Sequence, residues 1–457
     1  MSEQFLWGGS TSAFQFEGGG NEGGKGKSIY DVREEETGVP YSTASDFYHH
    51  YKEDIALMAE MGFRAFRMSI AWSRLFPDGD GELNQAGADF YRSVFMELKK
   101  HHIEPVVTLF HWDLPYCLVR RYDGFQSKKT LQAFIHYSKT CFELYGDIVK
   151  YWLTLNENNL GLMLPSMYSS KKRKKSDPDY WQYQWDTYHN TVMAHFYAVK
   201  LCHEIIPDAK IGCMMASSLA YPLSPDPRDV RAAQVHNQKV NWNELDLFTS
   251  GRYNIHMQKQ MKEVSVRPDI DETERTVMED ASSKMDFISF SYYFSVCMRD
   301  GENKNNEDAK TIQMLYAAYE NPCLEKSTFG WTIDPMGLRI FINELYDRYK
   351  LPVMIVENGL GVKDDVLNQD GTIHDAYRIA YLREHIEAVN YARKQDRIPV
   401  LGYLPWGCID LYSASGDRSK RYGFVYVDFE HDLKRYRKDS FFWYRKVIAS
   451  DGENLEL

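Results

Sequence analysis

The chain has 457 residues, of which 44% are hydrophobic and 26% are charged, as in ordinary globular proteins. The formal net charge of -11 argues against nucleic acid as the main partner, and no apolar run approaches the roughly 18–20 residues of a membrane span. Seven scattered cysteines without a CxxC pair, and an N-terminal stretch without the features of a signal peptide, predict a cytoplasmic protein with no zinc site. The oligomeric state stays open, a homo-oligomer included.

Short apolar runs typical of buried parallel strands alternate with helical repeats along the whole chain. The expected strands are Phe5–Phe14, Phe63–Trp72, Pro105–Trp112, Trp152–Leu155, Ala209–Ser217, Asp286–Tyr293, Val353–Val356 and Ile398–Trp406. Apolar residues spaced three or four apart predict helices through Phe47–Met58, Tyr91–Leu98, Val192–Val199, Leu338–Leu345 and Ile379–Val389. Gly62 is expected to end the first of these helices, and Asp375 to cap the last one.

Eight strands that alternate with helices, with no Pro-, Gly- or Ser-rich linker between halves, predict an α/β fold. The expected architecture is a single (β/α)8 barrel that spans residues 1–457 as one domain, and a doubly wound open sheet is the alternative. The residues at the C-terminal strand tips favour the barrel, because a barrel brings them to one site whereas an open sheet spreads them along an edge. These tip residues are Gln15, Arg67, His111, Glu157, Tyr293, Glu357 and Trp406.

Two of the strands end in a glutamate that has an asparagine beside it. Val353–Val356 ends at Glu357, and Trp152–Leu155 is followed by Asn156 and Glu157. A carboxylate at the tip of a buried strand is costly to desolvate and has no packing role. For either glutamate alone, capping or ion pairing in the following turn is the alternative interpretation. Two such carboxylates that face one site are the catalytic groups that retaining glycoside hydrolases use.

Two other motifs suggest different functions and are set aside. Gly18–Ser28 ends in Gly-Lys-Ser like a phosphate-binding loop, but Asn21 stands where the first glycine belongs and no clear helix is expected directly after it. We interpret this segment as a mobile surface loop. The basic run Lys171–Lys175 is interpreted as a solvated loop, with attraction of an anionic substrate as the alternative.

Five separate stretches, all in the right order, make the chain similar over nearly its full length to the family 1 glycoside hydrolases. They read SAFQFEG (12–18), FRMSIAWSR (66–74), TLFHWDLP (108–115), TLNE (154–157) and IVENG (355–359). Two positions depart from the family's usual pattern. Asn158 replaces the proline that normally follows the first catalytic glutamate, and Ser291 replaces an asparagine often found two residues before the tyrosine matched by Tyr293. Neither change removes a reacting group.

The resemblance implies that Glu157 is the acid/base and Glu357 the nucleophile. Burial of Glu157 near the anionic Glu357 should raise its pKa, so that Glu157 stays protonated until it donates to the leaving oxygen. The two carboxyl groups should lie about 5–5.5 Å apart. For the remaining implied residues, packing of the barrel is the alternative to the functional role. These implied roles are Arg67 and Tyr293 holding Glu357 ionised and aimed, Asn156 donating to the 2-hydroxyl, Gln15 and His111 meeting sugar hydroxyls, and Trp406 forming the floor under the sugar ring.

The loop after the eighth strand is the part of the sequence that says most about the substrate. Where β-glucosidases of the family carry Glu followed by Trp, this chain has Ser413 and Ala414. The change removes a carboxylate that would repel a 6-phosphate, while Lys420 and Tyr422 add a positive charge and a hydroxyl. Ser413 is preferred over Ser415 as the phosphate ligand. The pattern resembles that of the family's 6-phospho-β-glycosidases, among which Ala414 favours the gluco form over the galacto form.

The resemblance therefore implies a 6-phospho-β-glucosidase that needs no metal or organic cofactor. Its substrate would be a phosphorylated β-glucoside, either a disaccharide 6-phosphate or an aryl glucoside 6-phosphate. A 6-phospho-β-galactosidase or an unphosphorylated β-glucosidase of the same mechanism stays open, as does a catalytically silent sugar-binding barrel. The aglycone site is expected to border Tyr316–Trp331 and the Lys171–Lys175 loop, with Trp331 as the best candidate contact.

Overall fold

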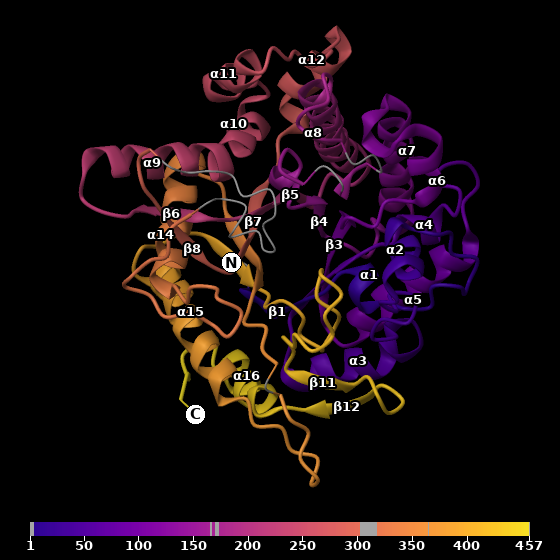
Figure 1. The fold of residues 1–457 in the computed structure, drawn as a ribbon. Coiled ribbons are helices and arrows are strands. Elements are labelled where there is room, and N and C mark those ends of the chain that lie inside the picture. The colour runs from indigo at the N-terminus through magenta and orange to yellow at the C-terminus, as the bar shows by residue number, and fades with distance from the viewer. Residues whose placement is uncertain (1–3, 165–166, 170–172, 302–317, 364, 457) are drawn as a thin grey trace.

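Eight parallel strands close into a barrel in the computed structural model, which describes residues 4–164, 167–169, 173–301, 318–363 and 365–456 (Figure 1). Around the barrel the strands follow the order β1-β10-β9-β7-β5-β4-β3-β2. The predicted (β/α)8 barrel is confirmed, and the open sheet is excluded. The barrel strands are β1 (Leu6–Ser10), β2 (Ala65–Ser69), β3 (Glu104–Phe110), β4 (Tyr151–Asn156), β5 (Lys210–Ala216), β7 (Phe287–Tyr292), β9 (Val353–Asn358) and β10 (Val400–Tyr403).

The first strand is shorter than the sequence predicts. β1 ends at Ser10, and the short helix α1 (Ala13–Phe16) follows where continued strand through Phe14 was expected. The chain turns at this point because the first backbone N–H of α1 donates to the Ser69 hydroxyl at the end of β2, at 2.8 Å. Gln15 therefore lies on a helix just beyond the strand.

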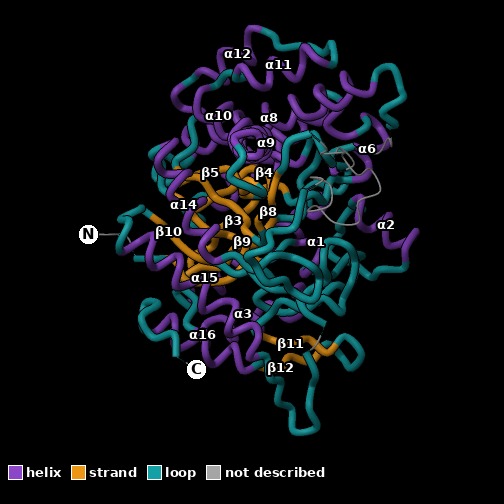
Figure 2. The backbone as a smooth tube through the Cα atoms, turned by 60° about the vertical axis from the view of Figure 1, so that its left-hand side comes forward, coloured by secondary structure: helices purple, strands orange, loops and turns teal. Residues whose placement is uncertain are grey.

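Helices surround the barrel and fill the connections between its strands (Figure 2). All five predicted helices are present, and the first of them ends at Gly62, whose φ of 84° favours glycine. Asp375 does precede α15, but its carboxylate bonds to Ser440 and Arg378 and does not cap α15, so that detail of the prediction is wrong. The α-helices after α1 are α2 (Ile29–Thr37), α3 (Phe47–Met61), α4 (Trp72–Leu75), α5 (Gln85–Lys100), α6 (Tyr116–Tyr122), α7 (Lys128–Tyr145), α8 (Tyr180–Ile205), α9 (Pro227–Asn237), α10 (Asn243–Ser250), α11 (Ile255–Glu263), α12 (Glu272–Glu279), α14 (Pro335–Tyr349), α15 (Ala376–Lys394) and α16 (Asp439–Ala449).

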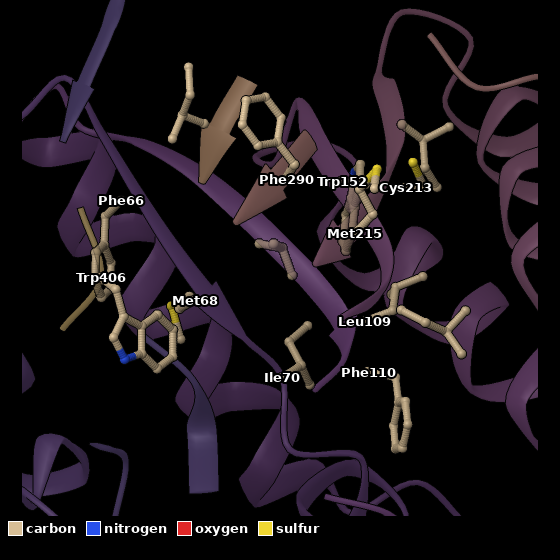
Figure 3. Close-up of a cluster of buried hydrophobic side chains, with 14 of the residues drawn as sticks. Phe66, Met68, Ile70, Leu109, Phe110, Trp152, Cys213, Met215, Phe290 and Trp406 are labelled. Atoms are coloured by element: carbon tan, nitrogen blue, oxygen red, sulfur yellow. The ribbon is translucent and has the colours of Figure 1, made fainter. Parts of the chain in front are cut away.

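The barrel interior changes from apolar to polar along the strands. Side chains alternate along a strand, so Arg67 and Thr108, two residues beyond Ala65 and Val106, face the same interior one layer further on. A larger apolar cluster includes side chains of the strands, such as Phe66, Trp152 and Phe290 (Figure 3), and of the surrounding helices. The polar layer therefore lies at the carboxyl ends of the strands. The apolar interior layer consists of Ala65, Val106, Leu153, Met214, Phe287, Met354, Val356 and Leu404.

The barrel closes between its first and last strands. β1 pairs with β10 in parallel, with Trp7 opposite Tyr403. The C-terminal helix α16 supports this closure, because the Tyr444 hydroxyl donates to the Gly8 carbonyl at 3.0 Å. Closure therefore depends on segments from both ends of the chain.

Two small sheets that the sequence pattern did not indicate lie outside the barrel. β6 (Leu219–Pro222) pairs in parallel with β8 (Ser295–Met298), and β11 (Val425–Asp428) pairs antiparallel with β12 (Lys434–Arg437). Both belong to loops at or after strand ends, so they shape the surroundings of the barrel mouth. None of the helices in the described ranges has the length and apolar character that crossing a membrane requires.

The Gly18–Ser28 segment leads directly into helix α2, which contradicts the expectation that no helix opens there. The Ser28 hydroxyl accepts backbone N–H groups of the first turn, and the Asp31 carboxylate accepts the Ser28 N–H at 2.6 Å. This arrangement is a capping box, with Asp31 in the place of the usual Glu or Gln. The serine of the Gly-Lys-Ser run is thus engaged in capping a helix.

Candidate active site

Glu357 lies at the C-terminal end of β9, and both of its carboxylate oxygens accept hydrogen bonds. The Arg67 guanidinium donates to Oε1 at 2.5 Å, and the Tyr293 hydroxyl donates to Oε2 at 2.8 Å. Arg67 is fully buried in β2 and is held from the other side by the Thr108 hydroxyl, which accepts from Nε at 2.9 Å. Two directional donors and a positive charge favour the ionised form of Glu357.

Glu157 follows β4 directly, in a left-handed backbone conformation with φ of 46° that is uncommon for a residue with a side chain. The Ser291 hydroxyl of β7 donates to Glu157 Oε1 at 2.6 Å. Ser291 also lies opposite Glu357 in the pairing of β7 with β9, so this serine binds Glu157 from the strand that neighbours Glu357. The contact was not predicted. Its available signal was spacing, because Ser291 lies two residues before Tyr293 and therefore on the same face.

The surroundings of the two carboxyl groups give them different pKa values. Desolvation, reinforced by the negative charge of Glu357, raises the pKa of Glu157 to about 8, although Ser291 and Arg67 oppose that rise. Burial also raises the pKa of Glu357, but the charge and hydrogen bond of Arg67 and the Tyr293 hydroxyl counteract the effect. Glu357 is therefore the group that ionises first, and Glu157 holds its proton at neutral pH.

Asn156 and His111 present donors beside the carboxyl pair. Asn156 Oδ1 accepts from Arg67 Nη2 at 2.5 Å, while its buried Nδ2 has no hydrogen-bond partner among the described residues. His111 Nδ1 lies 3.5 Å from the same Nη2, and desolvation and the Arg67 charge hold the pKa of His111 well below its ordinary value. The neutral ring that accepts at Nδ1 carries its proton on Nε2, which is left to donate to a ligand.

Trp406 and Gln15 both contact other side chains or backbone groups of the protein. Trp406 stacks on His111 with ring centroids 5.7 Å apart and belongs to the large apolar cluster, in which Figure 3 draws it. The Gln15 amide donates to the Tyr412 carbonyl at 2.6 Å and accepts from the Ser12 hydroxyl at 2.8 Å. An amide group has two donors and two lone pairs, so Gln15 retains capacity for one further partner on each side.

A third buried carboxyl lies behind Glu157 and was not predicted. Asn158 Nδ2 donates to Glu244 Oε2 at 2.7 Å, and the Tyr188 hydroxyl donates to the same oxygen at 3.0 Å. Burial raises the pKa of Glu244 to about 8. Asn158 thereby ties the residue next to Glu157 to helix α10. Glu244 lies 86 residues further along the chain, so no local pattern pointed to this contact.

The loop after β10 brings two serine hydroxyls together. Ser413 is buried, and its Oγ lies 2.7 Å from Ser415 Oγ and accepts the Asp417 N–H at 3.1 Å. Ala414, between the two serines, is exposed. Since the two hydroxyls are in hydrogen-bond contact, both can reach one ligand. Ser415 therefore stays a candidate phosphate ligand beside Ser413, which the sequence favoured.

Lys420 lies in a group of aromatic rings. Its Nζ is 3.9 Å from the ring centroid of Trp331, 4.5 Å from that of Phe329 and 5.6 Å from that of Tyr422. Within the described ranges no carboxylate lies within ion-pairing distance of this ammonium, and desolvation lowers the pKa of Lys420 to about 8. Trp331, predicted as an aglycone contact, thus contacts Lys420, and its ring also lies 5.4 Å from that of Tyr293.

Comparison with known proteins places the chain in a family. Residues 1–453 match the sequence profile of Glycosyl hydrolase family 1. The chain belongs to this family. It is 45% identical to 6-phospho-beta-glucosidase AscB of Escherichia coli (strain K12), over 99% of both chains, and 43% identical to Aryl-phospho-beta-D-glucosidase BglH of Bacillus subtilis (strain 168), over 99% of this chain and 98% of the other. A family 1 β-glucosidase structure from Thermotoga maritima matches with a TM-score of 0.87 at 32% identity, over 99% of both chains.

In this family 1 chain Tyr422 lies between the carboxyl pair and Lys420. Its ring contacts Lys420, while the negative charge of Glu357 contributes to raising the pKa of its hydroxyl. Of the predicted aglycone border, residues 316–317 and 171–172 lie outside the described residues.

Proposed function

We propose that this chain is a retaining 6-phospho-β-glucosidase, which hydrolyses 6-phospho-β-D-glucosides to glucose 6-phosphate and an aglycone within one catalytic domain. The observation that carries the proposal is the half-buried ammonium of Lys420, which lies beside Tyr422 and has no carboxylate within ion-pairing distance in the described part of the chain. Desolvation disfavours this charge in the free protein, and an anionic ligand would compensate it. The relatives named as phospho-β-glucosidases support the same substrate class.

In the first step, the Glu357 carboxylate attacks the anomeric carbon while Glu157 gives its proton to the glycosidic oxygen. The bond between the anomeric carbon and that oxygen breaks, the aglycone leaves as an alcohol, and the sugar becomes an ester of Glu357. We assign Asn156 to support this step by donating from Nδ2, which has no hydrogen-bond partner among the described residues, to the 2-hydroxyl. Arg67 and Tyr293 keep the attacking carboxylate ionised and aimed.

In the second step, Glu157 acts as a base. Formation of the ester removes the negative charge of Glu357, which was one cause of the high pKa of Glu157, so that pKa falls and the group stays ionised. Glu157 takes a proton from water, the water oxygen attacks the anomeric carbon, and the ester bond breaks. Glu357 is restored as a carboxylate and Glu157 as an acid, with the β configuration retained.

The 6-phosphate is assigned to the loop after β10. Lys420 supplies positive charge, and the hydroxyls of Ser413, Ser415 and Tyr422 supply neutral donors. The net charge of -11 repels a phosphorylated sugar at long range, so a local cation is required. Such substrates arise when a sugar is phosphorylated during uptake, which fits a cytoplasmic location. Two carboxyl groups and water complete the reaction, so no metal or organic cofactor enters it.

The decisive test compares nitrophenyl β-glucoside 6-phosphate with the unphosphorylated glucoside. We expect kcat/KM to be at least about 30-fold higher for the phosphorylated compound, because a charge-assisted contact in a partly buried site contributes about 2–5 kcal/mol. The corresponding 6-phospho-β-galactoside is measured alongside and is expected to be the poorer substrate. Equal or faster cleavage of the plain glucoside would contradict the phosphate assignment, and a preference for the galactoside would favour the galacto alternative.

The hydroxyl of Ser291 is expected to adjust the pKa of Glu157. Replacing Ser291 with alanine removes a donor to the carboxylate, so the pKa of Glu157 rises and the alkaline limb of the kcat/KM profile moves up by about one pH unit. Ser291→Thr keeps the hydroxyl and is the matched control, with a limb close to that of the wild type. The pH profile on the plain glucoside measures the shift. A loss of rate with an unmoved limb would mean that Ser291 has only a packing role.

A further inference from the structure

The loops that follow β9 and β10 are joined by a short antiparallel pairing. Val362 and Arg421 exchange two backbone hydrogen bonds, each 3.0 Å long. In such a pairing the residues before and after the bonded pair project to the opposite face. Positions 361 and 363 of the first loop therefore share a face with positions 422 and 420 of the second.

This shared face carries the side chains assigned to the phosphate group. Of these, Lys420 and Tyr422 project from the second loop, and Lys363, which is not assigned to the phosphate group, projects to the same face from the first. The geometry agrees with the pairing, because the Nζ atoms of Lys363 and Lys420 both lie over the ring of Phe329, at 5.7 and 4.5 Å from its centroid. The fourth position on the face is Gly361, which has no side chain.

The space above Gly361 is occupied by its two neighbours across the pairing. A Cβ atom at position 361 would lie 2.6 Å from Lys420 Cε, 2.7 Å from Lys420 Cγ and 2.9 Å from Tyr422 Cζ. All three distances are well below the roughly 3.5–4.0 Å of a favourable carbon–carbon contact. The Lys420 side chain thus passes through the volume that any side chain at position 361 would fill.

The backbone around this contact is held in place, so it cannot easily relieve an overlap. Arg378 Nη1 donates to the carbonyls of Leu360 and Tyr422, at 2.8 Å each, and the buried guanidinium pairs with Asp365 at 3.0 Å. Gly361 does not adopt a positive φ, so its backbone conformation is open to alanine. The requirement for glycine is therefore one of space.

We propose that Gly361 is a specificity-determining residue for the phosphate group of the substrate. Its missing side chain lets the Lys420 ammonium and the Tyr422 hydroxyl converge, and a side chain there displaces both. The inference rests on the proposed function, which assigns the phosphate to these two groups. It also means that the segment just beyond Glu357 sets the position of the phosphate ligands.

Gly361→Ala tests the inference directly. We expect kcat/KM for nitrophenyl β-glucoside 6-phosphate to fall about 10- to 100-fold, because displacing a binding group by about 1 Å can cost that much. The same constant for the plain glucoside should change less than about threefold. Thermal unfolding of the variant, followed by circular dichroism, establishes that the barrel is intact.

The second half of the experiment adds Gly361→Ala to Lys420→Ala, which lacks both lysine atoms that the new methyl group would meet. In that background the added methyl group should lower kcat/KM for the phosphorylated substrate by a clearly smaller factor than in the wild-type background, because only the contact with Tyr422 Cζ remains. An equal loss on both substrates, or an undiminished loss in the Lys420→Ala background, would overturn the inference while leaving the proposed function in place. A wild-type enzyme without phosphate preference would overturn both.

Discussion

Replacing Glu357 with glutamine is expected to lower kcat by at least about 10⁴-fold on both the phosphorylated and the plain glucoside. Glutamine has nearly the same shape but cannot attack the anomeric carbon, and a loss of this size corresponds to about 5 kcal/mol of activation free energy. The change also removes the carboxylate that pairs with the buried Arg67. Steady-state kinetics on nitrophenyl substrates gives the loss directly.

Glu244→Gln is the matched control for this variant, because Glu244 is also a buried glutamate near Glu157 but is not assigned to bond making or breaking. Its kcat should stay within about tenfold of the wild type. A 2-fluoro-glucoside 6-phosphate with a good leaving group should trap the ester, and peptide mapping should locate the label on Glu357. A label on another residue, or residual activity above about 1% in Glu357→Gln, would contradict the assignment of the nucleophile.

Replacing Lys420 with methionine is expected to lower kcat/KM for the phosphorylated glucoside by about 10²- to 10³-fold and to leave the plain glucoside nearly unaffected. Methionine keeps the apolar stem among the rings of Trp331, Phe329 and Tyr422 but removes the charge. Loss of one partner from a partly buried charge pair costs about 2–5 kcal/mol. The ratio of kcat/KM for the two substrates reports this effect and cancels any general loss of activity.

Lys363→Met provides the control, since Lys363 lies over the same Phe329 ring but is largely exposed and within 3.7 Å of the Asp417 carboxylate. Its effect on the substrate ratio should be no more than about threefold, because exposed charges are screened by solvent. A loss as large as that of Lys420→Met would show that the general positive potential of the loop, and not the Lys420 ammonium, selects the phosphate.

At alkaline pH the dependence of kcat/KM on pH should differ between the two substrates, because only the phosphorylated substrate uses the charge of Lys420. Glu157 must be protonated to donate to the leaving oxygen, and its pKa of about 8 gives a slope of -1 in log kcat/KM above that pH for both substrates. Lys420, also with a pKa of about 8, loses its charge over the same range, which steepens the slope toward -2 for the phosphorylated substrate alone. Lys420→Met should return that slope to -1. Equal slopes in the wild type would argue against a charged Lys420 in binding.

The barrel could be predicted because each of its strands is buried on both faces and therefore appears as a short apolar run. The polar residues at the ends of these runs, such as Glu157 and Glu357, were also visible, since a charged group directly after a buried strand is unusual. The end of β1 was less visible, because Ala13–Phe16 is as apolar as a strand. Its helical turn depends on a hydrogen bond to Ser69, a residue distant in sequence.

Contacts between distant parts of the chain account for the rest of what sequence patterns left open. The hydrogen bond from Ser291 to Glu157 joins β7 to the end of β4, past the intervening strand β5, between residues 134 positions apart. The contact of Trp331 with Lys420 likewise joins two loops, and no periodicity within either loop encodes it. Gly361 has no side chain, so its residue type gave no sign of a functional role. The inferred role depends on the positions of Lys420 and Tyr422, which only the structure gives.

The pairing of β1 with β10 also has a consequence for how the protein is made. Trp7 is synthesised early, whereas its partner Tyr403 leaves the ribosome almost 400 residues later. Until then one edge of the growing sheet has no strand beside it, and unpaired strand edges are where nascent chains associate wrongly. A contact between residues so far apart in the sequence forms slowly. The barrel and the catalytic site at its mouth therefore become complete only near the end of translation.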